Sequence, residues 1–151
     1  MGLNTYGRLI LYAEDSQLEQ ELFREALKES EYSFEVKFFN NGESLVEYLQ
    51  LSEDNPDSFP PPAIIMLDWQ MPVKSGLETL KQIKSHKDWK TIPVLIFSSH
   101  DDPEIIQIAY QAHANAYIKK PLGFDDLPRI LASIDDFWIK RVKLSYKNPD
   151  L

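Results

Sequence analysis

Three short apolar segments of this sequence each end directly in charged side chains. The first segment ends in Glu14 and Asp15, the second in Asp68, and the third in Lys119 and Lys120. Apolar runs of about five residues between turn signals are typical of strands buried on both faces of a sheet. In an open parallel α/β sheet, the carboxyl ends of the strands form the crevice that binds ligands. Carboxylates and a lysine gathered there would make a site for a divalent cation and a phosphoryl group.

Asp68 is the residue of this set best suited to act as a nucleophile. An aspartate that closes a strand can also be a helix cap or a turn former. Here residues 69–72 and then Gly76 follow, so the next helix is expected to start only near Leu77. The carboxylate therefore has no evident capping role. A carboxylate held on such a loop can attack phosphorus and form an acyl phosphate.

The acidic pair Glu14 and Asp15 has an ordinary structural alternative. Asp15 or Ser16 could cap the following helix, with Glu19 three residues after the serine as in a capping box. Beside Asp68, however, the pair offers the hard oxygen ligands that Mg²⁺ prefers. A bound cation would also offset the repulsion among three carboxylates. We therefore expect the pair to hold a metal.

The lysines and the serines that end two further strands also have structural alternatives. Lys119 and Lys120 could both be solvated, but neighbours on a strand point to opposite sides, so at most one faces the crevice. An ammonium there could pair with Asp68 at rest and with a phosphoryl oxygen later. Ser98 and Ser99 follow another apolar run, and one hydroxyl would be placed to donate to the phosphoryl group.

The elements that must position these side chains alternate between strand and helix patterns. Short apolar runs predict strands over 8–13, 34–39, 63–67, 92–97 and 115–118. Apolar residues recur with helical spacing over 18–27, 45–49, 77–83, 105–112 and 127–142. Five β–α units in strict alternation predict an α/β fold with a five-stranded parallel sheet, doubly wound, and a long C-terminal helix.

The length, net charge and composition of the chain narrow the class of protein. A chain of 151 residues suggests one domain, with a core over about 8–138 and an extended last helix and tail over 139–151. A net charge of -8 argues against a nucleic-acid partner. There is no cysteine, no secretory signal pattern and no apolar stretch near the ~20 residues of a membrane span. We expect a cytoplasmic protein with no membrane partner.

The order of the charged groups resembles the receiver domain of bacterial two-component response regulators. That family has an acidic pair after the first strand, a phospho-accepting aspartate after the third, Ser or Thr after the fourth and Lys-Pro after the fifth. The matching residues here are Glu14, Asp15, Asp68, Ser98, Lys120 and Pro121. The likeness covers roughly residues 8–138 and implies a flavodoxin-like receiver fold. Where the family often has glycine before the fifth strand, this chain has His113.

The resemblance implies a role for each matched residue. Asp68 would accept a phosphoryl group from a histidine kinase, and Lys120 would pair with that group. Asp15, Asp68 and the backbone carbonyl of Gln70 would bind Mg²⁺. Glu14 would act mostly through water. No other cofactor is implied.

The resemblance also implies which residues take part in the conformational switch and which set the lifetime of the phosphorylated state. Ser98 would hydrogen-bond the phosphoryl group, and Tyr117 would turn inward when Ser98 moves, although Tyr117 could also be a half-buried strand aromatic. Gln70 and His100 lie two residues after Asp68 and Ser98, where the family tunes the lifetime of the phosphoryl bond.

The end of the chain resembles stand-alone receivers that carry an aromatic-tryptophan pair in the last helix, here Phe137 and Trp138. Some of those are encoded with phytochrome kinases and form homodimers through the fourth and fifth helices. Both aromatic residues could equally belong to the core of an extended helix.

We therefore expect a single-domain response regulator that signals by conformational change or altered self-association. It would be no enzyme toward outside substrates and would catalyse only its own phosphorylation and dephosphorylation. One alternative is a phosphohydrolase with an aspartyl-phosphate intermediate, but such enzymes of the haloacid dehalogenase type have an aspartate where this chain has Gln70. The other is a receiver-like module that only binds partners, against which the complete acidic, hydroxyl and lysine set argues.

Overall fold

A five-stranded parallel sheet forms the middle layer of the computed structural model, which describes residues 8–145. The strand order is β2-β1-β3-β4-β5, and all four neighbouring pairs are parallel. The strands are β1 (Leu9–Ala13), β2 (Glu35–Phe39), β3 (Ile64–Leu67), β4 (Val94–Ser98) and β5 (Ala116–Lys119). The predicted α/β sheet is confirmed.

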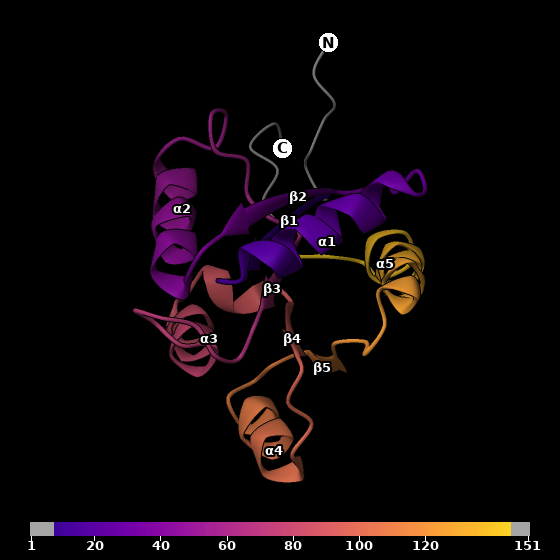
Figure 1. Cartoon of the computed structure of the whole chain (residues 1–151). Helices are drawn as coiled ribbons and strands as arrows, with labels where there is room; N and C mark the ends of the chain where they lie inside the picture. The colour runs from indigo at the N-terminus through magenta and orange to yellow at the C-terminus, as the bar shows by residue number, and fades with distance from the viewer. Residues whose placement is uncertain (1–7, 146–151) are drawn as a thin grey trace.

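Helices cover both faces of this sheet, as the alternation predicts (Figure 1). On one face lie α2 (Gly42–Asp54), α3 (Gly76–Ser85) and α4 (Pro103–Gln111). On the other lie α1 (Gln17–Lys28) and α5 (Leu127–Ser133). Two short 3₁₀ segments, η1 (Trp89–Thr91) and η2 (Phe124–Asp126), complete the connections before β4 and α5. No helix within residues 8–145 is long and apolar enough to span a bilayer.

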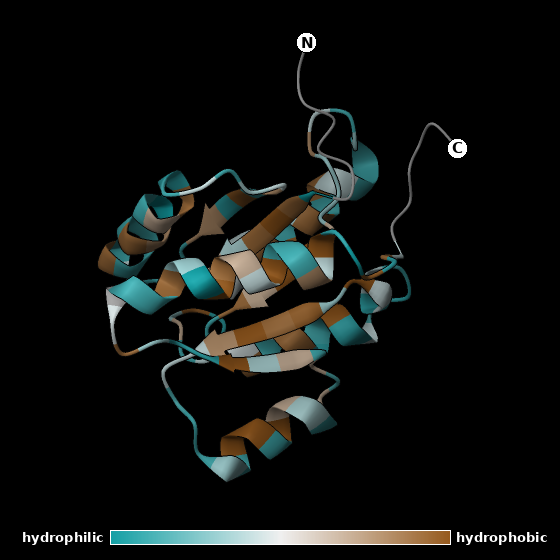
Figure 2. Ribbon diagram, turned by 90° about the vertical axis from the view of Figure 1, so that its right-hand side faces the viewer, coloured by the Kyte–Doolittle hydropathy of each residue, from teal (hydrophilic) through white to brown (hydrophobic). Residues whose placement is uncertain are grey.

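The core lies in two layers because the strands alternate their side chains. Along β1, Leu9, Leu11 and Ala13 pack with α2 and α3, whereas Ile10 and Tyr12 pack with α1 and α5. Figure 2 shows apolar residues concentrated along the strands. Burial on both faces explains why the central strands read as unbroken apolar runs. Each fully buried large side chain contributes about 1.5–3 kcal/mol.

The last helix is present but changes character half-way. After α5, a π-helical segment, η3 (Ile134–Ile139), continues the chain, with the amide of Lys140 donating to the carbonyl of Asp135 at 3.0 Å. The wider turn lets Trp138 pack on the core and leaves Phe137 55% exposed. The predicted stripe through Val142 is therefore wrong in its last turn, since the helix ends at Ile139. Residues 146–151 of the predicted tail lie outside the described residues.

Strand order brings the predicted site together. The chain leaves β1 for β2 on one side and reaches β3 on the other, so β1 and β3 are neighbours at the point where the order reverses. Ligands of open α/β sheets bind at the carboxyl ends of the strands at such a point. The loops after β1, β3, β4 and β5 all open toward it.

Candidate functional site

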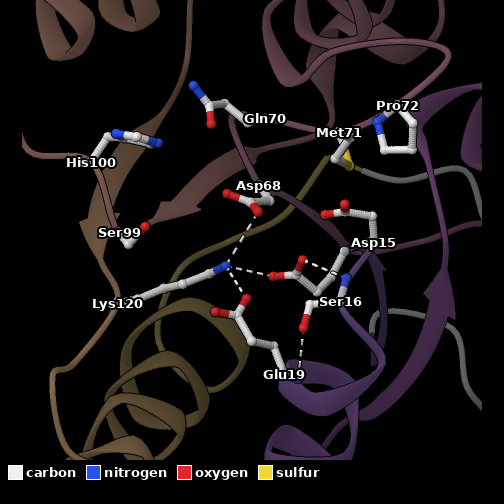
Figure 3. Close-up of a pocket in the computed structure, with 11 residues that line it drawn as sticks. Asp15, Ser16, Glu19, Asp68, Gln70, Met71, Pro72, Ser99, His100 and Lys120 are labelled. Atoms are coloured by element: carbon white, nitrogen blue, oxygen red, sulfur yellow. Dashed lines mark hydrogen bonds and ion pairs between the residues drawn. The ribbon is translucent and has the colours of Figure 1, made fainter.

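A cavity of about 500 Å³ lies at the carboxyl ends of the strands. Its lining includes six of the eight residues that the sequence singles out for the site: Glu14, Asp15, Asp68, Gln70, His100 and Lys120. Ser16, Glu19, Met71, Pro72 and Ser99 complete it. In the view of Figure 3, Asp68 lies between Asp15 on one side and Ser99 and His100 on the other. Residues from four loops and one helix therefore converge on one polar hollow.

Lys120 is the central cation of this site. Its Nζ lies 2.5 Å from Oε1 of Glu14 and 3.3 Å from Oδ2 of Asp68, and it also contacts Glu19. The Lys120 side chain is only 10% exposed. Lys119, by contrast, points to the other side of β5 and pairs with exposed Asp101 at 2.9 Å. Strand alternation thus separates the two lysines, and Lys120 is the one that faces the crevice.

Glu14 is the most deeply buried carboxylate of the site. Its oxygens accept hydrogen bonds from the Tyr12 hydroxyl at 3.3 Å and from the Ser16 amide at 3.1 Å. Burial, and then the hydrogen bond to Glu19, raise the pKa of Glu14 to about 8. That bond to Glu14 and the nearby Lys120 lower the pKa of Glu19. The two glutamates therefore share a site in which Glu14 holds its proton far more tightly than Glu19.

Glu19 is the site residue that sequence reasoning missed. Its amide donates to the Ser16 hydroxyl at 3.3 Å, so the predicted cap forms, but its carboxylate binds Lys120. The Ser16 amide donates to Glu14 instead, so the reciprocal half of the predicted capping box is wrong. A usable signal was present, because a first-turn residue of a helix that starts after β1 faces the same crevice as the end of β1.

Asp68 is held in a tight loop after β3. Its Oδ1 accepts from the Trp69 amide at 2.7 Å, which leaves Oδ2 facing Lys120. The loop then folds back, with the Gly76 amide donating to the Trp69 carbonyl at 3.0 Å. A Cβ at Gly76 would lie 2.2 Å from the Asp68 carbonyl oxygen, so only glycine permits this close return. The loop geometry therefore presents one carboxylate oxygen to the cavity.

Ser98 and Tyr117 lie beside the cavity rather than on its lining. Ser98 is fully buried at the end of β4, and its hydroxyl accepts from the His100 amide at 3.3 Å. The Tyr117 hydroxyl donates to the His100 carbonyl at 2.7 Å, and burial is the largest factor that raises its pKa. Ser99, the other serine, lines the cavity. Both expected switch residues thus bond to the backbone of one loop residue, His100.

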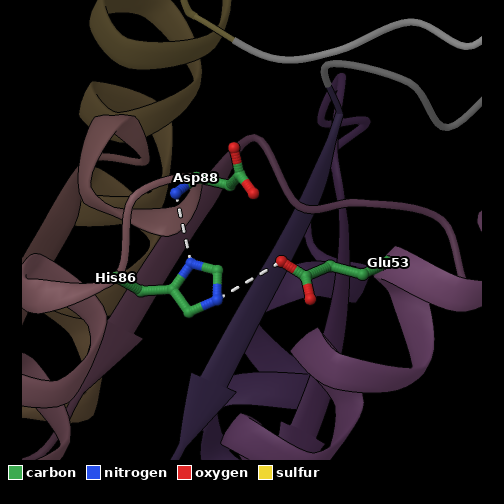
Figure 4. A group of neighbouring side chains, drawn as sticks. All are labelled: Glu53, His86 and Asp88. Atoms are coloured by element: carbon green, nitrogen blue, oxygen red, sulfur yellow. Dashed lines mark hydrogen bonds and ion pairs between the residues drawn. The ribbon is translucent and has the colours of Figure 1, made fainter.

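A second cluster of possible metal ligands, Glu53, His86 and Asp88, lies near the opposite ends of the strands (Figure 4). Nε2 of His86 faces a Glu53 oxygen at 3.4 Å, while Nδ1 accepts from the amides of Asp88 and Trp89. The imidazole also stacks on Trp89 with 3.7 Å between ring centroids. Through these contacts His86 ties α2 to the segment before β4.

The main site has a donor set suited to a small hard cation. Glu14, Glu19 and Asp68 each bring one carboxylate oxygen into a group whose atoms lie within 4.8 Å of one another, and Asp15 lines the same cavity. Carboxylate oxygen is the ligand type that Mg²⁺ and Mn²⁺ prefer. One ammonium does not balance these acids, so they favour a further positive charge.

Comparison with known proteins assigns the family. The model of the response regulator receiver domain matches residues 10–132. The chain belongs to the response regulator receiver family. It is therefore a signalling protein of two-component systems, in which receiver domains accept phosphoryl groups.

Individual relatives of this receiver domain match along most of their length. Response regulator Rcp1 of Synechocystis sp. is 34% identical over 91% of this chain and 92% of that protein. The polar-differentiation response regulator DivK of Brucella anthropi is 31% identical over 85% of this chain and 94% of its own. The crystal structure of the phosphorylated cyanobacterial phytochrome response regulator RcpA has a TM-score of 0.82 and 32% identity, covering 92% of this chain and 99% of that one.

Proposed function

We propose that Asp68 is the residue of this receiver domain that accepts the phosphoryl group. The observation that carries the proposal is the placement of Asp68 Oδ2, 3.3 Å from Lys120 Nζ and at the edge of a polar cavity. In the transfer, this oxygen attacks the phosphorus of a phosphohistidine, the P–N bond breaks, and the imidazole leaves with the electron pair and takes up a proton. Lys120 then pairs with the negative oxygens of the phosphoryl group.

The cation that we propose for this site is Mg²⁺. Asp15, Asp68 and the backbone carbonyl of Gln70 would hold it, with Glu14 acting through water. When bound, a divalent ion supplies positive charge to the phosphoryl oxygens and offsets repulsion among the carboxylates. The crystal structure of Mn²⁺-bound Rcp1, with a TM-score of 0.79 and 31% identity, supports a divalent ion in a similar fold.

The proposed output begins at the β4–α4 loop. Ser98 would rotate its hydroxyl toward the phosphoryl group and so release the His100 amide, to which it is now bonded. Tyr117, whose hydroxyl is bonded to the carbonyl of the same residue, would then be free to turn inward. The side chains of Gln70 and His100 flank the cavity and would tune the lifetime of the phosphorylated state.

The proposed partner is a histidine kinase, specifically one of the phytochrome type in the cytoplasm. Similarity to the phytochrome response regulator RcpA over 92% of this chain supports this choice. A homodimer through α4 and α5 is a second proposal, because Ile108 and Tyr110 of α4 and Phe137 after α5 are exposed apolar residues. We also propose that nucleic acid is not a partner of this protein.

A direct labelling experiment tests the acceptor. The protein is incubated with acetyl phosphate and Mg²⁺, and its intact mass is measured. We expect one added phosphoryl group on the wild type and none on Asp68→Asn. We also propose that the protein catalyses only this transfer to Asp68 and the later hydrolysis of the acyl phosphate, which releases inorganic phosphate, so phosphomonoesters should not be turned over. Equal labelling of Asp68→Asn, or brisk release of phosphate from such esters, would overturn the proposal.

A further inference from the structure

Glu19 contacts the central lysine of the site without belonging to any strand end. Its carboxylate comes from the first turn of α1 and binds Nζ of Lys120, the ammonium that also contacts Glu14 and Asp68. The Glu19 side chain is 41% exposed, against 1% for Glu14 and 13% for Asp68. Glu19 is thus the one carboxylate of the three that can swing into solvent without leaving a buried charge.

The distances show which acids hold the ammonium. Nζ of Lys120 contacts Glu19 and lies 2.5 Å from Glu14, but 3.3 Å from Asp68. Lys120 therefore sits closer to the two glutamates than to the acceptor. A phosphoryl group on Asp68 would therefore compete with Glu19 for this ammonium.

We propose that Glu19 is a positioning residue that retains Lys120 on the glutamate side of the site and thereby slows phosphoryl transfer to Asp68. This inference rests on the proposed role of Asp68 as acceptor. The Glu19 charge acts against transfer in two ways: it competes for Lys120, and it repels the incoming phosphoryl oxygens.

The same negative charge favours the divalent cation. Glu19 belongs to the group of oxygens that could hold a metal ion, and even without direct ligation its charge attracts one. Glu19 should therefore act in opposite directions on two successive events, strengthening cation binding and slowing transfer. A residue that only stabilised α1 would not separate these events.

The test compares Glu19→Gln with the matched control Glu21→Gln, which removes one charge from an exposed position of the same helix. First, Mg²⁺ is titrated without any phosphodonor, with the change in tryptophan fluorescence as the readout, because Trp69 adjoins Asp68. Second, the rate of labelling by acetyl phosphate is measured at saturating Mg²⁺. For Glu19→Gln we expect the Mg²⁺ dissociation constant and the labelling rate each to rise about fivefold, about 1 kcal/mol.

The controls separate the possible failures. Glu21→Gln should change neither quantity by more than about twofold, and Glu19→Asp, which keeps the charge, should lie nearer the wild type. Thermal melts verify that each variant folds. If Glu19→Gln leaves both quantities unchanged, or weakens both binding and rate together, the inference is wrong while the acceptor role of Asp68 stands. If the wild type is not labelled, the proposed function fails and this inference falls with it.

Discussion

Replacement of Lys120 by methionine should destabilise the cation-free protein strongly, whereas the same change at Lys119 should not. Lys120 is 10% exposed and contacts three carboxylates, but Lys119 is 45% exposed and makes a surface pair with Asp101. Removing one partner of a buried ion pair costs about 3–5 kcal/mol. An exposed pair contributes at most about 1 kcal/mol. The two lysines are adjacent in sequence, so each is the control for the other.

The loss of unfolding free energy expected for Lys120→Met lies at the lower end of the range of about 3–5 kcal/mol. Burial raises the pKa of Glu14, so without Lys120 this deepest carboxyl group can take up a proton and need not remain as a buried charge. The uncompensated charges are then those of Asp68 and Glu19, which are partly exposed. We expect a loss of about 3 kcal/mol for Lys120→Met and about 0.5 kcal/mol for Lys119→Met.

Urea unfolding with and without Mg²⁺ measures both consequences of the change. Because the ammonium and the cation compete for the same carboxylates, Lys120→Met should bind Mg²⁺ about tenfold more tightly than the wild type. Saturating Mg²⁺ should then stabilise the variant by about 1.4 kcal/mol more than the wild type. Equal losses for the two variants, or a smaller Mg²⁺ effect in Lys120→Met, would refute the placement of Lys120 among these acids.

Three further changes test other parts of the fold, each by urea unfolding. His113→Gly should stabilise the protein by about 1 kcal/mol, since His113 has a φ of 74° that glycine adopts without strain; unchanged or lower stability would contradict this. Gly76→Ala should cost about 3 kcal/mol and reduce labelling, because its Cβ meets the Asp68 carbonyl oxygen at 2.2 Å, and a wild-type midpoint would contradict the loop geometry. Tyr48 donates to the Pro60 carbonyl at 2.8 Å, and burial raises its pKa to about 12. Because this pKa is higher in the folded than in the unfolded protein, the contribution of the protonated Tyr48 hydroxyl to stability is present below pH 10 and is lost as the pH rises through 12. Tyr48→Phe should therefore lose less stability than the wild type over that pH range. Parallel pH profiles of the two proteins would contradict this.

The strand-end residues were predictable from the sequence because backbone periodicity governs them. Apolar runs and turn signals predict where each strand ends, and alternation leaves one lysine of two for the crevice. The structure accordingly places Glu14, Asp68 and Lys120 in one cavity. Glu19 was predicted only as a capping residue, because the choice between a backbone amide and a distant ammonium depends on packing that sequence spacing does not contain.

The last helix shows a second limit of periodicity. A spacing of 3.6 residues per turn puts Phe137 and Trp138 near one face, and both a core role and a surface role remained open. In the π-helical turn of η3, Trp138 packs against the core and Phe137 is exposed, so the two residues have different roles. Such a turn has no sequence signature, because it depends on how the helix meets α1 and the strands beneath it.

Backbone bonds of the sheet continue into the site itself. The amide of Glu14 donates to Phe39 of β2 at 2.8 Å, that of Asp68 to Ala13 of β1 at 3.1 Å, and that of Lys120 to Ser98 of β4 at 2.8 Å. The backbones of Asp68, the proposed acceptor, and of Glu14 and Lys120 are therefore held by the same ladder as the buried strands. Glu19, which is on a helix and partly exposed, lies outside this ladder. When the charge on Asp68 changes, we therefore expect the side chains of the site to move and the strand backbone to stay in place. The effect of that charge change should thus reach the rest of the protein through the side-chain hydrogen bonds to His100 rather than through movement of the strands.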